Sequence, residues 1–117
     1  MHKYFFLILI FISIISSCSE TVIDDIDPPP IEEVVAYNPE IKAVIDNFCI
    51  NCHNADFSSG GLNLSDYNLV RNATENANLI QRINDVQNPM PQSGLMPAEE
   101  RALFDKWVED GFPENQE

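Results

Sequence analysis

Two cysteines and a histidine form the most distinctive group of reactive side chains in this sequence. They stand in the run Cys49-Ile50-Asn51-Cys52-His53. The spacing C-x-x-C-H is the attachment signature of c-type haem, in which each thiol joins one vinyl group of the porphyrin. The histidine after the second cysteine then lies beneath the iron as an axial ligand. The run predicts one haem c, attached covalently through Cys49 and Cys52 and coordinated by His53.

Two other kinds of site use the same residue types. A redox dithiol of thioredoxin type shares the C-x-x-C spacing, but it is typical of a strand-helix-strand setting that the flanking sequence does not predict. A structural zinc site takes four ligands, usually cysteine or histidine. After residue 18 only Cys49, Cys52 and His53 are available, so the fourth ligand would be a carboxylate. A haem-free protein with a structural zinc or dithiol site is therefore one alternative.

Residues 1–17 have the composition of a signal peptide. A short basic start, His2-Lys3, precedes an apolar run over 4–15 that only Ser13 interrupts. This run is shorter than the roughly 20 residues that a membrane-spanning helix needs. We therefore predict a secretory signal that is removed from the mature chain.

Cys18 ends the run ISSC over 15–18, which resembles the lipobox of bacterial lipoproteins. Cleavage there makes Cys18 the lipidated first residue of the mature chain. The prediction is an exported lipoprotein, anchored to a bacterial membrane on the periplasmic side or at the cell surface. Ser19, in place of an aspartate, favours the outer membrane. The alternative is an ordinary signal peptide that leaves Cys18 as a free thiol.

The chain is strongly acidic, with 19 Asp and Glu, 6 Lys and Arg, and a formal net charge of −13. Such a charge repels the phosphate backbone, which excludes nucleic acid as a partner. Loss of Lys3 with the signal peptide makes the mature chain more negative still. We expect redox partners with a basic docking face, whose association is slowed by salt.

Residues 18–37 are predicted to form a tether between the lipid anchor and a folded domain at 38–117. From 19 to 37 the chain holds six acids and no base, with three consecutive prolines at 28–30. This composition is typical of a solvated, partly extended linker. The alternative is that residues 31–36 pack on the domain as an extended arm.

Hydrophobic periodicity predicts an all-α domain. The first helix is expected to begin with Asn38 as N-cap and Pro39 at its first position, and Ser65 to cap the second. Gly111 stands where a left-handed residue would end the last helix, which is expected to pack across the first. Trp107 of that helix is expected in the core or at the haem edge. The expected helices span residues 39–48, 66–71, 75–84 and 97–110.

The proline-rich loop before the last helix holds the candidate for a second axial ligand. Met90 lies between Pro89 and Pro91, which restrict the backbone around its thioether. Methionine opposite histidine is a known haem ligand pair. Since His2 leaves with the signal, the mature chain has no second histidine, and we predict Met90 as the sixth ligand. The alternatives are Met96, which is better explained as a hydrophobic staple before the helix, and an open or differently ligated sixth site.

In these features the chain resembles the small monohaem c-type cytochrome domains of planctomycete and Bacteroidetes type. The resemblance covers about residues 38–111, and the family's axial methionine maps onto Met90. It implies a cytochrome c-like fold, with three to four short helices wrapped around one covalently bound haem and the N- and C-terminal helices packed together. The matching runs are residues 49–53, 60–65, 79–83, 90–94 and 99–107.

The predicted function is one-electron transfer by a membrane-anchored cytochrome with His/Met axial ligation, an electron carrier and not an enzyme. The protein could also serve as an accessory subunit of an oxidoreductase. A haem sensor or small peroxidase with an open sixth site is the alternative. Arg71 and Arg82 are candidate partners of the haem propionates, because a guanidinium grips a carboxylate with two hydrogen bonds. The other interpretation makes them ordinary surface arginines.

Overall fold

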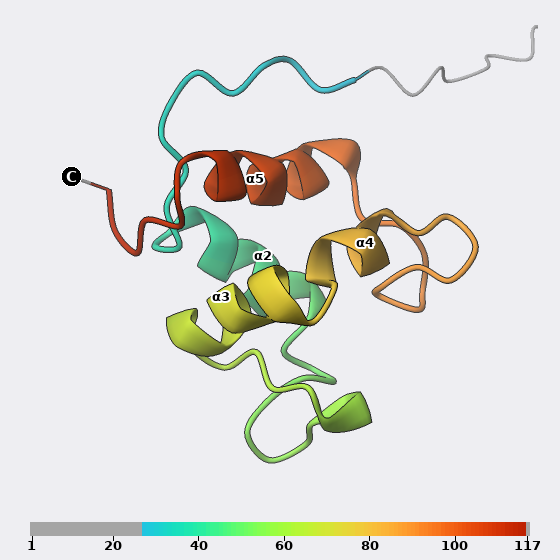
Figure 1. The fold of residues 1–117 in the computed structure, drawn as a ribbon. Helices are drawn as coiled ribbons and strands as arrows, with labels where there is room; N and C mark the ends of the chain where they lie inside the picture. Colours follow the sequence, from blue (N-terminus) through green and yellow to red (C-terminus); the bar gives the residue numbers. More distant parts are fainter. Residues whose placement is uncertain (1–26, 117) are drawn as a thin grey trace, which may run out of the picture.

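The structure is a computed structural model that describes residues 27–116. The predicted signal peptide, Cys18 and the first part of the predicted tether lie outside these residues. The described chain is all-α, as predicted, with four α-helices and one short 3-10 turn, and no sheet forms within it. Every helix in it is too short or too polar to span a bilayer. The elements (Figure 1) are α2 (Glu40–Phe48), η2 (Ser59–Gly61), α3 (Tyr67–Asn76), α4 (Leu79–Asn84) and α5 (Ala98–Glu109).

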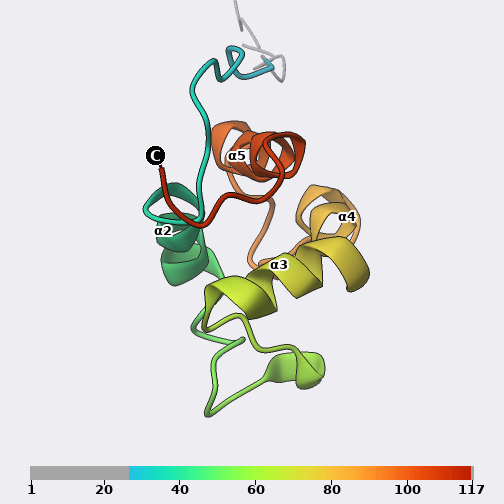
Figure 2. The same cartoon turned by 60° about the vertical axis from the view of Figure 1, so that its left-hand side comes forward.

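The first and last of these helices pack together, as predicted. α2 contacts α5, while α4 contacts both α3 and α5. Figure 2 shows α5 nearly end-on, above α2 on one side and α4 on the other. Ile41, Val44 and Ile45 of α2 are buried in the core between them. Their spacing of three and four residues places all three on one helix face.

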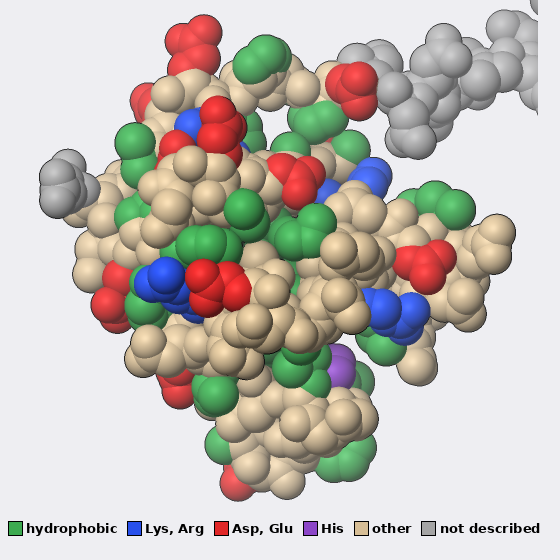
Figure 3. Space-filling view, viewed as in Figure 1, with side chains coloured by type: hydrophobic (Ala, Val, Ile, Leu, Met, Phe, Trp, Pro, Cys, Tyr) green, Lys and Arg blue, Asp and Glu red, His purple; other side chains and the backbone are tan. Residues whose placement is uncertain are grey.

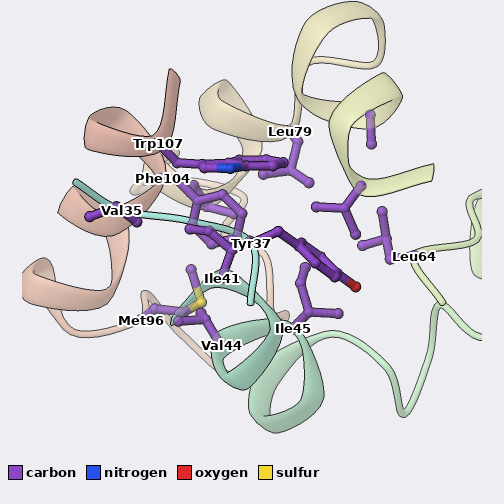
Figure 4. Packing of buried hydrophobic residues seen from close by; sticks show 13 residues of the cluster. Val35, Tyr37, Ile41, Val44, Ile45, Leu64, Leu79, Met96, Phe104 and Trp107 are labelled. Atoms are coloured by element: carbon purple, nitrogen blue, oxygen red, sulfur yellow. The ribbon is translucent and has the colours of Figure 1, made fainter. Parts of the chain in front are cut away.

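Trp107 lies in an aromatic cluster at the centre of the core. It and Phe104 are 0% exposed, and its ring centroid lies 4.9 Å from that of Phe112 and 6.2 Å from that of Tyr37. The indole N–H donates to the carbonyl of Pro113 at 3.0 Å, so its one polar atom is satisfied. Figure 4 shows the Trp107 and Phe104 rings side by side in this cluster. The expected core position of Trp107 is confirmed.

The end of α5 is also as predicted. Gly111 has φ 82°, in the left-handed region that glycine enters without a steric penalty. The N–H of Gly111 donates to the carbonyl of Val108 at 3.1 Å, and that of Phe112 to the carbonyl of Trp107 at 2.9 Å. These two bonds define a Schellman motif, and the Phe112 ring against Trp107 is its usual hydrophobic contact.

The start of α2 differs from the prediction. Pro39 occupies the N-cap position, and no side chain caps the helix. Asn38 donates instead through its amide group to the side chain of Asn115 at 3.3 Å and through its N–H to the carbonyl of Glu114 at 2.9 Å. The prediction of Asn38 as N-cap was wrong because the C-terminal segment takes up its hydrogen bonds.

The middle helices have other bounds than predicted. Asp66, not Ser65, caps α3, and its carboxylate accepts the N–H of Leu69 at 3.0 Å. α3 then continues to residue 76 and takes in the start of the helix expected at 75–84. The break comes at Asn78, which has φ 56°. Asparagine tolerates this left-handed conformation better than most residues because its short side chain can hydrogen-bond locally.

The last residues of the predicted tether belong to the packed domain. The N–H of Val35 donates to the carboxylate of Asp110 at 2.8 Å, and that of Tyr37 to the carbonyl of Pro113 at 2.8 Å. Ile31 is partly buried against the same core. These residues therefore form an extended arm that packs along α5 and the C-terminal segment, in agreement with the alternative to a solvated tether. The buried residues of this arm are Val35, Ala36 and Tyr37.

Candidate functional site

The two thiols and the imidazole share one tight turn, here called the cysteine turn (residues 49–53), which leaves the C-terminal end of α2. Cys49 is the C-cap residue, and its N–H donates to the carbonyl of Ile45 at 2.9 Å. Its own carbonyl accepts the N–H groups of Cys52 at 3.1 Å and of His53 at 3.0 Å. Both cysteines are free thiols, Cys49 half-buried and Cys52 exposed. Because α2 fixes Cys49, the turn also fixes the backbone of Cys52 and His53.

The ring of His53 is held by a carbonyl from the next part of the chain. Nδ1 lies 3.1 Å from the backbone oxygen of Leu62. A carbonyl oxygen only accepts hydrogen bonds, so Nδ1 carries a proton in this contact, and in the neutral ring the lone pair is then on Nε2. The N–H of Leu64 donates in turn to the carbonyl of His53 at 2.8 Å. Metal-ligating histidines are oriented in this way, with the second ring nitrogen bound to a carbonyl or carboxylate.

Short-range hydrogen bonds organise the rest of the site lobe (residues 49–64). The side-chain amide of Asn54 donates to the carbonyl of Ile50 at 2.8 Å, and its oxygen accepts the N–H of Phe57 at 2.8 Å. The N–H of Ser59 donates to the carbonyl of Cys52 at 2.9 Å. His53 is half-buried, and Cys49, Ile50 and Leu62 of the lobe pack against the hydrophobic core. The lobe thus presents the imidazole at an apolar junction.

The electrostatics of Cys49 do not suit a reactive dithiol. Burial raises the pKa of its thiol to about 11, so the thiol stays protonated at neutral pH. Redox-active cysteines have a lowered pKa, from positive neighbours or a helix N-terminus. Cys49 instead follows the C-terminal end of α2, where the helix dipole disfavours a negative charge.

The donor set of the cysteine turn fits a covalently attached haem. It offers two free thiols on one turn and an imidazole whose Nε2 is available. A closed zinc site would need four converging ligands. Within residues 27–116, no three side chains of His, Cys, Asp or Glu converge as the ligands of one metal ion.

The two candidate methionines lie in different environments. Met96 is 3% exposed and belongs to the hydrophobic core, and Figure 4 shows it beside Val44 of α2. Met90 is half-buried and lies on the loop between α4 and α5, apart in the sequence from the cysteine turn. Its N–H donates to the carbonyl of Arg82 at 3.1 Å. Met96 is therefore a core residue, whereas the side chain of Met90 is only partly buried.

The arginines predicted as propionate partners contact other side chains. Arg71 donates to the hydroxyl of Tyr67 at 3.3 Å and lies 5.2 Å from the ring centroid of Phe112. Arg82 forms an ion pair with Asp85 at 3.6 Å. Both arginines keep about two fifths of their side-chain surface exposed, at 42% each. Both side chains therefore remain partly accessible to solvent.

The sequence interpretation missed a third arginine. Arg101, in the first turns of α5, donates through Nη1 to the side-chain oxygen of Asn84 at 2.7 Å and through Nε to the carbonyl of Met96 at 3.2 Å. These acceptors stand at the two ends of the loop that carries Met90. No local pattern predicts such a contact, because it depends on how α4 and α5 pack.

Two hollows open along α5, away from the cysteine turn. Neither is lined by Cys49, Cys52, His53 or Met90. The first, of about 260 Å³, is lined by Pro28, Pro29, Ile31, Glu99, Glu100 and Leu103. The second, of about 430 Å³, is lined by Asp27, Pro28, Asn84, Ala98, Arg101, Ala102 and Asp105.

Comparison with known proteins gives no match: no family model, no curated protein and no solved structure matches this chain. Function must therefore be argued from the site, since a helical fold by itself serves many activities. The site joins Cys49, Cys52 and His53 on one turn, and it places Met90 on a separate loop.

Proposed function

We propose that this protein is an exported, lipid-anchored c-type cytochrome that transfers single electrons through one haem c. Cys49 and Cys52 attach the haem, and His53 and Met90 are its axial ligands. The observation that carries the proposal is the cysteine turn with the His53 ring held on the carbonyl of Leu62. The bound haem supplies an iron that takes up and releases one electron.

The chain's own residues orient and tune the imidazole. The carbonyl of Leu62 keeps the proton on Nδ1 of His53, which leaves Nε2 as the coordinating atom and raises its basicity. The backbone bond from Leu64 to His53 fixes the loop that supplies this carbonyl. In metal sites, mutation of a group that holds a ligating histidine in this way typically lowers metal affinity or activity by about 10–100-fold.

The surface charge supports the proposed redox partner with a basic face. Four of the five described basic residues pair with an acid three or four residues further along the same segment. On the face drawn in Figure 3, acidic side chains are more widespread than basic ones. Attraction between opposite faces speeds encounter and weakens with salt. The four paired bases are Lys42, Arg71, Arg82 and Lys106.

Haem attachment is tested by expressing the full chain with the c-type maturation machinery. The expected product carries haem that stays with the polypeptide after acid-acetone extraction, gives a pyridine haemochrome spectrum and adds the mass of one haem. Cys49→Ser with Cys52→Ser is expected to lose all covalent haem. Cys18→Ser is the matched cysteine control, which should keep the haem and lose the lipid and the membrane fraction. A colourless wild-type protein with the mass of polypeptide and lipid alone contradicts the proposal.

Axial ligation is tested with the two methionines. Met90→Ala should abolish the absorption of the ferric iron–thioether bond, whereas Met96→Ala should keep it. The reduced wild-type protein should bind carbon monoxide slowly and incompletely at neutral pH. Rapid, complete binding would contradict Met90 as ligand and favour a sensor or peroxidase with an open sixth site.

A further inference from the structure

We propose that Arg101 is a positioning residue that holds the methionine loop (residues 85–97) closed by tying its two ends together. The inference rests on the proposed function, because Met90 of this loop is the axial ligand there. Arg101 acts through the loop and makes no contact with the haem in this proposal.

The tie consists of two hydrogen bonds from Arg101, one to each end of the methionine loop. The methionine loop connects the end of α4 at Asn84 with the start of α5 at Ala98. One guanidinium donates to a residue at each end, to the Asn84 side chain at 2.7 Å and to the Met96 carbonyl at 3.2 Å. Since Arg101 belongs to α5, it fastens the beginning of the loop to the helix that follows it.

Arginine is the residue suited to this task. Its guanidinium is planar, always charged, and carries donors on three nitrogens in fixed directions, so it can serve two acceptors at once. The acceptor on Asn84 is itself held, because the side-chain amide of Asn84 donates to the carbonyl of Ile80 at 3.0 Å. A lysine at the same position would keep the charge but lose the two-directional fork.

The loop between these ends has few other attachments to the helical body. Val86 is 75% exposed and Leu95 is 39% exposed, so burial of these side chains stabilises the loop little. Met90 is attached through its N–H to the carbonyl of Arg82 at 3.1 Å. The side chain of Met96 anchors one end in the core, and Arg101 links that end to Asn84.

Loss of the tie should raise the fraction of molecules in which Met90 is off the iron. An added ligand such as imidazole binds the ferric protein only in that open state, so its apparent affinity rises in proportion to the open fraction. A charge-assisted hydrogen bond at a half-buried position corresponds to about a tenfold change in such an equilibrium.

The experiment titrates the ferric holoprotein with imidazole and follows the iron–thioether absorption. Arg101→Gln should increase the apparent affinity about tenfold, Asn84→Ala about threefold, and Arg101→Lys should fall between the wild type and Arg101→Gln. Lys42→Gln is the charge-matched control, because it removes a cation from an exposed pair with Asp46 on α2. The apparent imidazole affinity of Lys42→Gln should stay within about twofold of the wild-type value.

Backbone hydrogen exchange gives a second readout that does not use the haem. Exchange at residues 86–95 should be faster in Arg101→Gln than in the wild type and unchanged in Lys42→Gln, while α2 and α5 keep their protection. Asn84→Ala, a milder change, tests the same tie if Arg101→Gln does not fold.

The outcomes separate the two proposals. If the wild type carries haem but Arg101→Gln and Asn84→Ala show wild-type imidazole affinity and loop exchange, the tie is overturned. Faster exchange over the whole domain also overturns it, since Arg101 would then act on global stability. If the wild type carries no haem, the proposed function fails, and the exchange comparison alone decides whether Arg101 holds the loop.

Discussion

The helical body and the site lobe of this protein are held together by different forces. In the body, α2, α5 and the arm bury Trp107, Phe104 and Ile41 completely, each at 0% exposure. In the site lobe, Asn54 and the cysteine turn are linked mainly by hydrogen bonds over a few residues, and Phe57 is 62% exposed. Apolar burial is the larger stabilising term in folding, whereas each net hydrogen bond contributes about 0.5–1.5 kcal/mol.

The difference suggests a division of roles. A body stabilised by burial can fold around its aromatic cluster, while the exposed tip of the lobe around Phe57 has little burial to order it and can gain order from a bound group. Functional residues commonly lie on such loops, positioned by a rigid scaffold. The Leu62 carbonyl that orients His53 belongs to the lobe, so ligand geometry depends on the less protected part of the molecule.

The largest expected effect comes from Trp107 in the body. Trp107→Ala should lower the free energy of unfolding by about 3–5 kcal/mol, because it removes a fully buried aromatic side chain and leaves a cavity. Urea denaturation followed by far-UV circular dichroism measures the change. Val108→Ala is the control at the next position, 40% exposed, and should change the value by no more than about 0.5 kcal/mol. Equal effects of the two variants would show that the aromatic cluster does not dominate stability.

A second comparison sharpens the role of Met96. Met96→Ala should cost about 2–5 kcal/mol of unfolding free energy, as for other buried residues truncated to alanine. Met96→Leu keeps the volume and should cost less than about 1.5 kcal/mol, again measured by urea denaturation. Met96→Leu should also keep the iron–thioether absorption. Loss of that absorption in Met96→Leu would transfer the ligand role from Met90 to Met96.

Gly111 tests the local signal that ends α5. Gly111→Ala should destabilise the protein by about 1–2 kcal/mol, because a Cβ is disfavoured at φ 82°. The space around this position is open, so the loss comes from backbone conformation and not from a clash. Thermal denaturation measures it. An unchanged melting temperature would mean that the Schellman motif is not needed.

The smallest expected effect is that of Asp110 on the thermal stability at acidic pH. Its pKa is lowered, first by the hydrogen bond from Lys106 and then by that from the Val35 N–H, so its charged form is favoured in the folded state. The stability it contributes is present above the ordinary value of 3.8 and is lost as the pH falls through the lower folded value. Asp110→Asn should therefore flatten the fall of Tm between about pH 5 and about pH 3.

The control for this titration is Asp105→Asn, an exposed position on the same helix. Its Tm profile should follow that of the wild type. If Asp110→Asn and the wild type lose Tm in parallel on acidification, the arm is not held through the charge of Asp110.

The local signal at the end of α5 was predicted correctly, whereas the hydrogen bonds between distant segments were not predicted. The end of α5 was predicted because Gly111 and Phe112 stop the helix by contacts within six residues. Asn38 was assigned as a cap because its local sequence fits one, but its side chain bonds to Asn115, 77 residues away. The arm at 35–37 was placed in the tether, with packing of residues 31–36 on the domain as the alternative, because its partners Asp110 and Pro113 lie at the other end of the chain.

The sequence by itself determined the chemistry on offer: two thiols and an imidazole on one turn, apolar stripes for helices, and a methionine between two prolines. The tertiary structure alone decided how these groups are held. The Leu62 carbonyl behind His53, the burial of Met96 and the tie from Arg101 to Asn84 appear only once the loops and helices have packed. The physical reason is the separation along the sequence between the residues that contact one another. Residue spacing encodes bonds within a turn or a helix, whereas contacts between separate segments depend on the packing of the whole chain.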